Sequence, residues 1–390
     1  MVAQRTREQT LRSLTIIVGV QWMGSTLGLP LLPLFLRHRG GSPTIVGFVI
    51  AAFFVAGLAT QFVVGHLSDR FGRRRILVWG LIAYAVASGT YLLPVGAQWF
   101  ALSRAVQGIG AGAIEVASLS AVSELFGESE RGRAISKILA AQLLGTALGP
   151  MLGSLVTVNH LGWAFLAAGV ASSVVSIRAL RSDLGHEGHS HLPLPKLQRT
   201  RQLYGAIAAA ISVGLCIGVY ETDWSQLMHH LGATSFEIRL SWTTFCIPWV
   251  LLSRVGGWLA DHANRKYIAA AGLTSTAIFL GLYPHIHTIW MLLALGPLEA
   301  VGAALSVPST SSLLTQGATP NEMGRRQGLF TSANTAALAA SAGCAGALFS
   351  INPTLPFTVV AIVSLASTAS LLYWWRHVTG RISVANAPSS

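Results

Sequence analysis

The chain has 390 residues, of which 52% are hydrophobic and only 10% charged, and its formal net charge is +12. A water-soluble domain carries about 25% charged residues, so this composition excludes a globular protein with an ordinary hydrated surface. The charges are also clustered, since no Asp, Glu, Lys or Arg occurs from Ile76 to Ser103. Because a helix that crosses a bilayer needs about 20 apolar residues, we expect a polytopic membrane protein.

Apolar stretches between charged or turn residues predict twelve spanning helices. In chain order they cover 13–36, 44–66, 76–94, 98–122, 134–157, 161–179, 204–228, 237–258, 267–284, 288–314, 327–350 and 354–375. The first stretch is longer than the about 7–15 residues of a signal-peptide core, so we expect it to remain as a spanning helix. The three cysteines all lie in apolar stretches and predict no disulfide framework.

The distribution of basic residues predicts the orientation. Twelve spans place both termini on one side, and the loops of that side carry 21 Lys and Arg against 3 on the other. Cytoplasmic loops are enriched in Lys and Arg. We therefore expect a multi-pass protein of the cytoplasmic (inner) membrane with both termini in the cytoplasm. This accounts for the net charge without a nucleic-acid partner.

The sequence repeats itself at an offset of 192 residues. Three pairs share this offset: Asp69 and Asp261, Gly132 and Gly324, and Gly40 and Gly232. We therefore expect an all-α membrane protein of two six-helix bundles, 1–180 and 204–390, joined by a cytoplasmic linker at 181–203. Parallel repeats of this kind are related by a pseudo-twofold axis along the membrane normal, with the substrate site between them.

The loop at 65–75 combines small residues with charges and predicts a cytoplasmic gate. Gly65 would allow two helices to approach closely, and Asp69 could accept backbone N–H bonds from the start of another helix. Arg73 could pair with Glu124 at the end of the fourth span. The expected gating residues are Gly65, Asp69, Arg70, Gly72, Arg73, Arg74, Glu124, Gly257, Asp261 and Arg265. The alternative is that the arginines only fix the topology.

A stripe of glycines marks the fifth span. Gly145, Gly149 and Gly153 are four residues apart and therefore share one face of a helix, while Pro150 removes a backbone donor and can kink the helix. Two interpretations stay open. The face is a hinge or a leak-tight seam between the halves, or it is an ordinary contact between small residues of neighbouring helices.

Three motifs resemble signatures of the major facilitator superfamily. They are GHLSDRFGRRR at 65–75, SRAVQGIGAG at 103–112 and GTALGPMLG at 145–153, the last being similar to the helix-five motif of proton-coupled drug antiporters. The resemblance implies a twelve-helix transporter that works by alternating access. Two departures stand out: His262 and Asn264 replace the Arg and Gly of the first loop, and Ser154 stands where the fuller helix-five pattern has Gly.

Ionisable side chains inside spans cost about 2.5–3.5 kcal/mol each, so we expect them to face a cavity or a partner. Arg104 and Glu115 share one face of the fourth span, about 16 Å apart along its axis, and the 192-residue offset aligns Glu299 with Gln107. Glu115 and Glu299 are the leading candidates for the proton carrier, and the competing interpretation is a structural ion pair or hydrogen bond.

Glu221 and Asp223 lie about 200° apart around an α-helix, so we expect at most one of them to face the cavity, with the other near the headgroups. The whole expected substrate and proton pathway is Gln21, Trp22, Arg104, Gln107, Glu115, Tyr220, Glu221, Asp223 and Glu299. Three further tryptophans, Trp163, Trp374 and Trp375, are expected in the membrane-interface belt.

The resulting hypothesis is a monomeric proton-coupled antiporter that exports small amphipathic organic compounds, with protons and the lipid bilayer as its other partners. No H-E-x-x-H or G-x-S-x-G motif occurs, so we expect neither an enzyme nor a cofactor. His186, His189 and His191 lie in the linker and suggest a metal exporter as an alternative, although a solvated linker is preferred. The same sequence also fits a glycolipid flippase, a sugar or metabolite exporter, or a non-transporting sensor.

Overall fold

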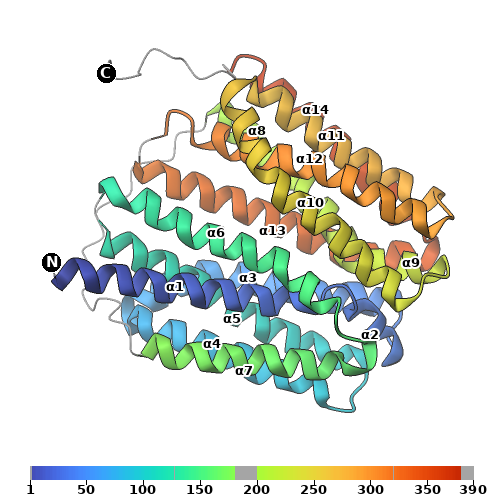
Figure 1. Cartoon of the computed structure of the whole chain (residues 1–390), viewed down its shortest axis with the longest axis horizontal. Helices are drawn as coiled ribbons and strands as arrows, with labels where there is room; N and C mark the ends of the chain where they lie inside the picture. The colour runs from blue at the N-terminus through green and yellow to red at the C-terminus, as the bar shows by residue number, and fades with distance from the viewer. Residues whose placement is uncertain (1, 127, 181–199, 319, 379–390) are drawn as a thin grey trace. The chain divides into compact units, whose positions relative to one another are not determined.

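The computed structural model of the chain describes residues 2–126, 128–180, 200–318 and 320–378, and helices are the regular structure throughout them (Figure 1). The helices of the first part of the chain are α1 Val2–Leu27, α2 Leu32–His38, α3 Pro43–Phe71, α4 Arg73–Gly89, α5 Phe100–Leu125, α6 Glu128–Gly153 and α7 Leu161–Leu180. Those of the second part are α8 Arg201–Val219, α9 Ser225–His230, α10 Ser235–His262, α11 Arg265–Leu282, α12 Ile289–Thr315, α13 Pro320–Ile351 and α14 Leu355–Trp375. Short turns of 3₁₀-helix are η1 Thr90–Leu92, η2 Ala97–Trp99, η3 Val158–His160 and η5 Tyr283–His285, and η4 Tyr220–Trp224 is a π-helix.

The lengths and composition of these helices confirm the predicted all-α membrane fold. Among the described residues, ten helical segments are long and apolar enough to cross a bilayer, or eleven if α1 and α2, bent by 46°, form one span. Twelve spans are reached if α10 is added. Its 28 residues would extend about 42 Å, more than the about 30 Å of a hydrocarbon core, but it is less apolar than the other spans.

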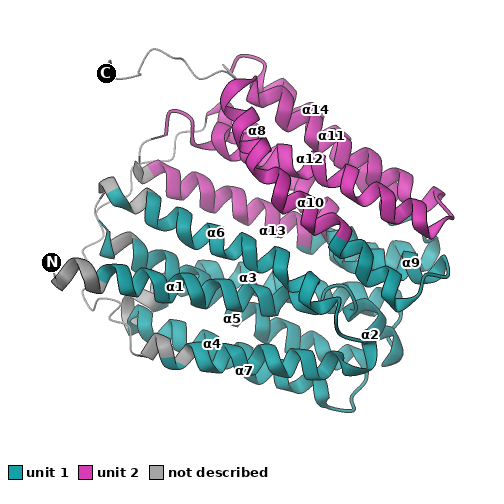
Figure 2. Cartoon of the chain, in the orientation of Figure 1, with its two compact units in different colours: residues 1–193, 218–243, 339–356 teal, residues 194–217, 244–338, 357–390 magenta. Residues whose placement is uncertain are grey.

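The contacts divide the chain into two compact units (Figure 2). Unit 1 comprises Met1–Pro193, Gly218–Thr243 and Ala339–Pro356, and unit 2 comprises Leu194–Ile217, Thr244–Leu338 and Phe357–Ser390. Unit 1 therefore combines most of the first half of the sequence with short segments of the second half. The two bundles expected from the repeat, at 1–180 and 204–390, stay a prediction. The contact-based units do not test them, because the repeat concerns duplication of the sequence.

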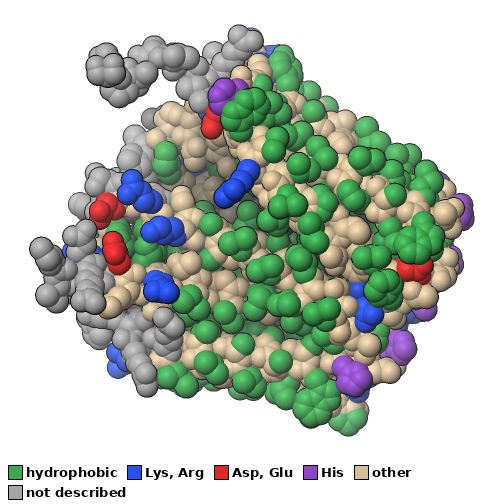
Figure 3. All heavy atoms as spheres, viewed as in Figure 1, with side chains coloured by type: hydrophobic (Ala, Val, Ile, Leu, Met, Phe, Trp, Pro, Cys, Tyr) green, Lys and Arg blue, Asp and Glu red, His purple; other side chains and the backbone are tan. Residues whose placement is uncertain are grey.

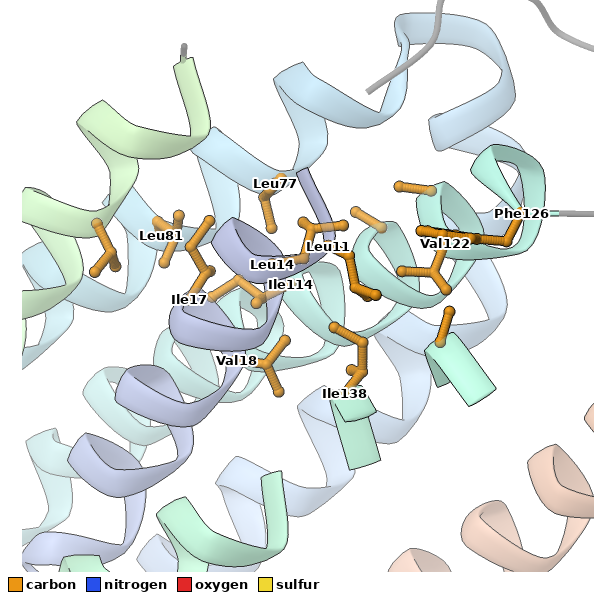
Figure 4. Close-up of a cluster of buried hydrophobic side chains, with 14 residues drawn as sticks. Leu11, Leu14, Ile17, Val18, Leu77, Leu81, Ile114, Val122, Phe126 and Ile138 are labelled. Atoms are coloured by element: carbon orange, nitrogen blue, oxygen red, sulfur yellow. The ribbon is translucent and has the colours of Figure 1, made fainter. Parts of the chain in front are cut away.

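Unit 1 is a helix bundle in which α1 packs against α6 and α7, α3 against α5, and α4 against α5 and α7. Its buried cluster includes Leu14, Ile17, Leu81 and Ile114, each fully buried (Figure 4). In the part of Figure 3 that unit 1 occupies, hydrophobic side chains cover the middle of the surface and charged ones lie toward its two ends. Such a surface fits lipid, where helices associate through close packing of their side chains.

The same glycine crossing occurs once in each unit. In unit 1 a Cβ atom on Gly80 would lie 2.9 Å from the carbonyl oxygen of Gly110, so α4 and α5 cross backbone to backbone. In unit 2 a Cβ on Gly302 would lie 3.0 Å from the carbonyl oxygen of Gly272, where α11 and α12 cross. Both pairs are related by the 192-residue offset, so the repeat extends to the way neighbouring helices pack.

A second repeated feature is the turn that ends α2 and α9. Gly40 and Gly232 have φ values of 81° and 87°, the left-handed conformation that a glycine after a helix adopts at no steric cost. The backbone N–H of Gly40 donates to the carbonyl of Arg37, and that of Gly232 donates to the carbonyl of His229, both at 3.0 Å. The glycine pair noted in the sequence therefore reflects one helix-ending turn used twice.

The first helix of each half is interrupted at the same position of the repeat. In the first half the helix stops at Leu27 and resumes at Leu32, around Pro30. In the second half the corresponding residues, again 192 positions later, form the π-helix η4 between α8 and α9. The first break fits the presence of proline, which removes a backbone donor, whereas the second contains no proline or glycine and is held by the side-chain contacts described below.

Unit 2 contains its own buried cluster, which includes Leu203, Leu273 and Leu371. Trp375 belongs to it and is fully buried, and its indole N–H donates to the carbonyl of Gln202 at 3.2 Å. The expectation that Trp375 lies in the membrane-interface belt is therefore wrong, because the absence of a side chain at Gly205 leaves space that the indole fills.

Candidate functional site

A buried polar cluster in unit 1 is centred on Arg104 of α5. The side chain is 1% exposed, and its guanidinium carbon lies 4.5 Å from the centre of the Phe53 ring. One terminal nitrogen donates to Oε1 of Gln107 at 3.2 Å. Gln107 in turn donates to the hydroxyl of Ser88 at 2.9 Å and accepts from the hydroxyl of Tyr91 at 3.4 Å. Neutral groups and a π face therefore surround the buried charge.

The guanidinium of Arg104 keeps unused hydrogen-bonding capacity. Arginine has five N–H donors, and Nε of Arg104 is buried without a hydrogen-bond partner. Among the described residues no carboxylate forms an ion pair with Arg104. Because a buried charge is costly until it is paired, this cation is placed to attract a carboxylate or another anionic group.

Glu221 of η4 is the carboxylate on which that charge acts. Glu221 is 7% exposed, one of its oxygens is buried without a hydrogen-bond partner, and the charge of Arg104 interacts with it electrostatically. Both residues belong to unit 1. The structure thus brings together two residues that are 117 positions apart in the sequence, without joining them in an ion pair.

Asp223, two residues further along η4, is fully buried as well. One of its oxygens accepts a hydrogen bond from the side-chain amide of Gln226 at 3.1 Å, and the same amide donates to the carbonyl of Thr222 at 2.9 Å. We expected one of the two acids near the headgroups, but the structure buries both. The reason is tertiary, because η4 packs against α2 and α3 of the same unit.

Three other predicted pathway residues lie in unit 1 with partners of their own. Glu115 is partly exposed and accepts from the amide of Gln61 at 3.4 Å. Gln21 is buried and donates to Ser25 on the same helix at 2.7 Å. Tyr220 is half-buried, with its ring edge-on to that of Trp224 at 5.9 Å. Their place in a substrate pathway stays a prediction.

Trp22 is half-buried, and its indole N–H has no hydrogen-bond partner although the nitrogen is buried. It packs against the hydrophobic cluster of unit 1. One face of this tryptophan therefore has a structural role, whereas the predicted contact with substrate remains a prediction.

Glu299 of α12 lies in unit 2 and is 3% exposed. The hydroxyl of Tyr283 donates to its carboxylate at 2.8 Å. This pair corresponds, at the 192-residue offset, to Tyr91 and Gln107 of unit 1. The equivalent tyrosine hydroxyl therefore donates to an amide in one half and to a carboxylate in the other.

Part of the predicted gate lies outside the described residues: nothing is described of the side chains of Gly65, Asp69, Arg70 and Glu124. Gly72 precedes α4 with φ 84°, whereas Asn264, its counterpart in the repeat, has φ −79°. The first-half loop therefore uses a backbone conformation that the second half does not. Arg73 and Arg74 are half-buried in the first turn of α4.

In the second-half loop Asp261 and Arg265 form an ion pair of 3.6 Å within one turn of chain. Arg265 also donates to the carbonyl of Ala260 at 2.8 Å, and a Cβ atom on Gly257 would meet open space. These contacts are local, so the proposed gate stays a prediction. The linker histidines His186, His189 and His191 also lie outside the described residues.

The glycine stripe of α6 packs against α1. A Cβ on Gly145 would lie 3.0 Å from the backbone N of Met23, and one on Gly149 would lie 2.6 Å from the Met23 carbonyl oxygen. A Cβ on Gly153 would overlap the carbonyl of Leu27, and Pro150 is buried within the helix. The contact favours the interpretation as close helix packing, and a hinge stays a prediction.

Sequence reasoning missed Phe53, Tyr91, Tyr283 and Gln226. For the two tyrosines a signal existed, because they share the 192-residue offset with Gln107 and Glu299. For Phe53 no signal existed, since aromatic residues are common in spans and its contact with Arg104 depends on how α3 and α5 cross.

The comparisons with known proteins agree with this architecture. The sequence profile of the Major Facilitator Superfamily matches residues 14–222 and again 205–389. The chain is 24% identical to Multidrug resistance protein 2 of Bacillus subtilis over 376 residues, which cover 92% of this chain and 93% of the relative. It is 34% identical to the Chloramphenicol resistance protein of Pseudomonas aeruginosa over 314 residues, 76% of this chain and 73% of that protein.

Solved structures share the fold at low identity. A bacterial homologue of the human lysosomal transporter Spinster, in an inward-facing and occupied conformation, superposes with a TM-score of 0.76 at 11% identity, covering 95% of this chain and 97% of that one. The human organic anion transporter MFSD10 superposes with a TM-score of 0.65 at 19% identity, covering 94% and 99%. With the profile matching both halves, the chain belongs to the Major Facilitator Superfamily of membrane transporters.

Proposed function

We propose that this transporter is a proton-coupled antiporter that exports small amphipathic organic compounds across the cytoplasmic membrane, with both termini in the cytoplasm. Two relatives named for multidrug and chloramphenicol resistance support the choice of substrate class. The excess of basic residues in alternate loops supports the orientation.

The observation that carries the proposal is the relation between Glu221 and Arg104. Burial favours the protonated form of a carboxylate, and a nearby cation favours the charged form. Glu221 is buried, has an oxygen without a partner and lies within the field of Arg104, yet no ion pair joins them. A carboxylate held between these opposing effects can bind a proton in one state and release it in another.

The driving force of the proposed cycle is the inward movement of protons. It supplies about 2.3 kcal/mol per 100 mV and per proton, in addition to any pH difference. When Glu221 loses its proton, its charge is attracted to Arg104, and pairing of the two would reshape the buried cluster. That coupling links the proton to the conformation of the carrier, which is what exchange of a proton for a substrate requires.

Glu221 leads the other two candidates for the proton carrier because of its partners. Glu299 accepts a short hydrogen bond from Tyr283, and Glu115 accepts a longer one from Gln61 and is partly exposed. The groups that act on Glu115 include no cation, whereas the charge of Arg104 acts on Glu221. All three remain testable, and Trp22 and Tyr220 are proposed to contribute to the substrate surface.

The experiment uses an efflux-deficient bacterial host and inverted membrane vesicles, with chloramphenicol as the first probe. We expect Glu221→Gln to reduce proton-driven transport at least about tenfold, because loss of the proton carrier removes the coupling itself. A tenfold change in rate corresponds to only about 1.4 kcal/mol. Glu115→Gln and Glu299→Gln are measured beside it. Glu130→Gln, an exposed carboxylate of α6, is the matched control and should transport like the unchanged protein.

Full activity of Glu221→Gln would remove it as the carrier, and loss of activity in Glu115→Gln or Glu299→Gln would transfer the role to that residue. If no compound of a chemically varied panel produces a proton flux with the unchanged protein, the proposed antiport itself fails and a sensor becomes the better hypothesis.

A further inference from the structure

The short π-helix η4 is held by side chains that the proposed proton cycle does not use. π-Helical turns inside α-helices are rare and are frequently found at functional sites. This one, Tyr220–Trp224, carries Glu221 and Asp223 and is buried from Glu221 to Trp224. Because Glu221 lies within this turn, whatever holds the turn also sets the direction of the Glu221 side chain.

The first support comes from Gln226 on α9, two residues after the turn. The side-chain amide of Gln226 donates to the carbonyl of Thr222 at 2.9 Å and to a carboxylate oxygen of Asp223 at 3.1 Å. Gln226 is itself 5% exposed and Asp223 fully buried. One amide therefore joins a backbone carbonyl of the π-turn to the side chain of the next residue, and Asp223 serves as the acceptor that orients the amide.

Two further contacts anchor the turn to the rest of unit 1. The hydroxyl of Ser225 donates to the carbonyl of Pro30 at 2.6 Å, in the break between α1 and α2. The indole N–H of Trp224 donates to the hydroxyl of Ser241 on α10 at 2.8 Å. The break between α1 and α2 is thus hydrogen-bonded to the residue directly after η4, and the last residue of η4 is hydrogen-bonded to α10.

The two acids of the turn, Glu221 and Asp223, have different electrostatic surroundings. α3, which packs against η4, has no ionisable residue from Pro43 to Gly65. The ionisable residues of α2 are Arg37 and His38, and those of α9 are His229 and His230, and all four side chains are at the surface. On α5 the charge of Arg104 acts on Glu221, whereas the partner of Asp223 is the neutral amide of Gln226.

We propose that Asp223 and Gln226 are positioning residues, which hold the π-turn so that Glu221 stays in the field of Arg104, and that Asp223 carries no transported proton. The expected effect on transport rests on the proposed function. The positioning of Glu221 by these two residues concerns local structure and does not depend on it.

The test compares substitutions that keep or remove the acceptor. Asp223→Asn retains a carbonyl oxygen for the amide of Gln226, whereas Asp223→Ala and Gln226→Leu abolish the contact. Thr368→Val on α14 is the control, because it also removes a buried hydroxyl that donates to a helix carbonyl, at 2.9 Å. Proton-driven transport of chloramphenicol is measured in vesicles from pH 5 to pH 9 at equal amounts of folded protein.

We expect Asp223→Asn to transport within about twofold of the unchanged protein with the same pH midpoint. Asp223→Ala and Gln226→Leu should lose about tenfold, which matches the cost of an unmade buried hydrogen bond, and should shift the pH midpoint of transport by about half a unit or more. A role limited to folding would lower the amount or thermal stability of the protein and leave the midpoint unchanged, as expected for Thr368→Val.

A second readout does not require transport. The carboxyl band of Glu221 is identified in the infrared spectrum of the purified protein by its absence in Glu221→Gln, and its intensity is followed against pH. The midpoint should move in Gln226→Leu and Asp223→Ala and stay in place in Asp223→Asn. An unmoved midpoint in Gln226→Leu overturns the positioning role.

Loss of proton-driven transport in Asp223→Asn, with Gln226→Leu active, would also overturn the proposal by making Asp223 a carrier. If the unchanged protein transports nothing but the Glu221 band responds as expected, the positioning role holds and the proposed antiport fails. The two failures are thus separable.

Discussion

The buried tyrosine contacts show how one residue can change the chemistry of a repeated site. Tyr91 and Tyr283 occupy the same position of the two halves, and each hydroxyl donates to the side chain 16 residues later. In unit 1 that side chain is the neutral Gln107, at 3.4 Å, and in unit 2 it is Glu299, at 2.8 Å. A hydrogen bond to a carboxylate is shorter and stronger than one between neutral groups, which the two distances reflect.

At this scale we predict that Tyr283→Phe destabilises the protein more than Tyr91→Phe. Removing the donor to Glu299 leaves a buried carboxyl group with one partner fewer, at a cost of about 1–3 kcal/mol, whereas the longer neutral bond of Tyr91 is worth about 0.5–1.5 kcal/mol. Thermal unfolding of the two variants in detergent, followed by a thiol-reactive dye or by light scattering, gives the comparison. Equal or reversed losses would contradict the importance of the Glu299 contact.

The α1–α6 contact illustrates what a stripe of small residues does at the scale of an element. Gly145, Gly149 and Gly153 place the backbone of α6 directly against α1, and their missing side chains leave no space between the two helices. In a bilayer, where lipid tails are as apolar as the side chains, such close contact is a main source of helix association.

We therefore predict that Gly149→Ala is destabilising. The added Cβ would overlap the hydroxyl of Thr26 and lie 2.6 Å from the carbonyl oxygen of Met23, so α1 has to move. Overpacking of this kind costs about 1–3 kcal/mol. Gly328→Ala on α13 is the control, since a Cβ there meets nothing within 4 Å and alanine favours a helix by about 1 kcal/mol over glycine.

The pair is measured by the thermal midpoint of the purified variants. A Gly149→Ala protein as stable as Gly328→Ala would show that the two helices separate without cost, and it would reopen the interpretation of the stripe as a movable seam.

At the scale of the whole molecule, the duplication and the charge bias together predict the orientation. Ten or eleven helical segments qualify as spans among the described residues, and adding α10 would give the predicted twelve, which would place both termini on one side. The distribution of 21 basic residues on that side against 3 on the other predicts that it is the cytoplasmic side.

The orientation is tested with single cysteines in a variant from which Cys216, Cys246 and Cys344 are removed. His230→Cys, at the end of α9, should react in intact cells with a membrane-impermeant maleimide. Lys137→Cys on α6, which is also exposed, should react after the membrane is opened. Labelling of Lys137→Cys in intact cells, with His230→Cys protected, would reverse the assigned orientation.

The amino-acid sequence by itself determined the membrane class, most of the spans, the repeat and the family resemblance. These properties depend on local composition and on spacing along the chain, because a span needs about 20 apolar residues whatever its neighbours are. The repeat even carried detail that was overlooked, since the tyrosines before Gln107 and Glu299 are visible at the same offset.

The tertiary structure alone decided which groups meet. The contact of Arg104 with Phe53 depends on the crossing of α3 and α5. The effect of the Arg104 charge on Glu221 depends on the packing of η4, which is far from α5 in the sequence. The burial of Asp223 and of Trp375 likewise depends on neighbours that composition does not identify. A span can be read from the free energy of transferring one segment into lipid, but a site arises from distances between segments.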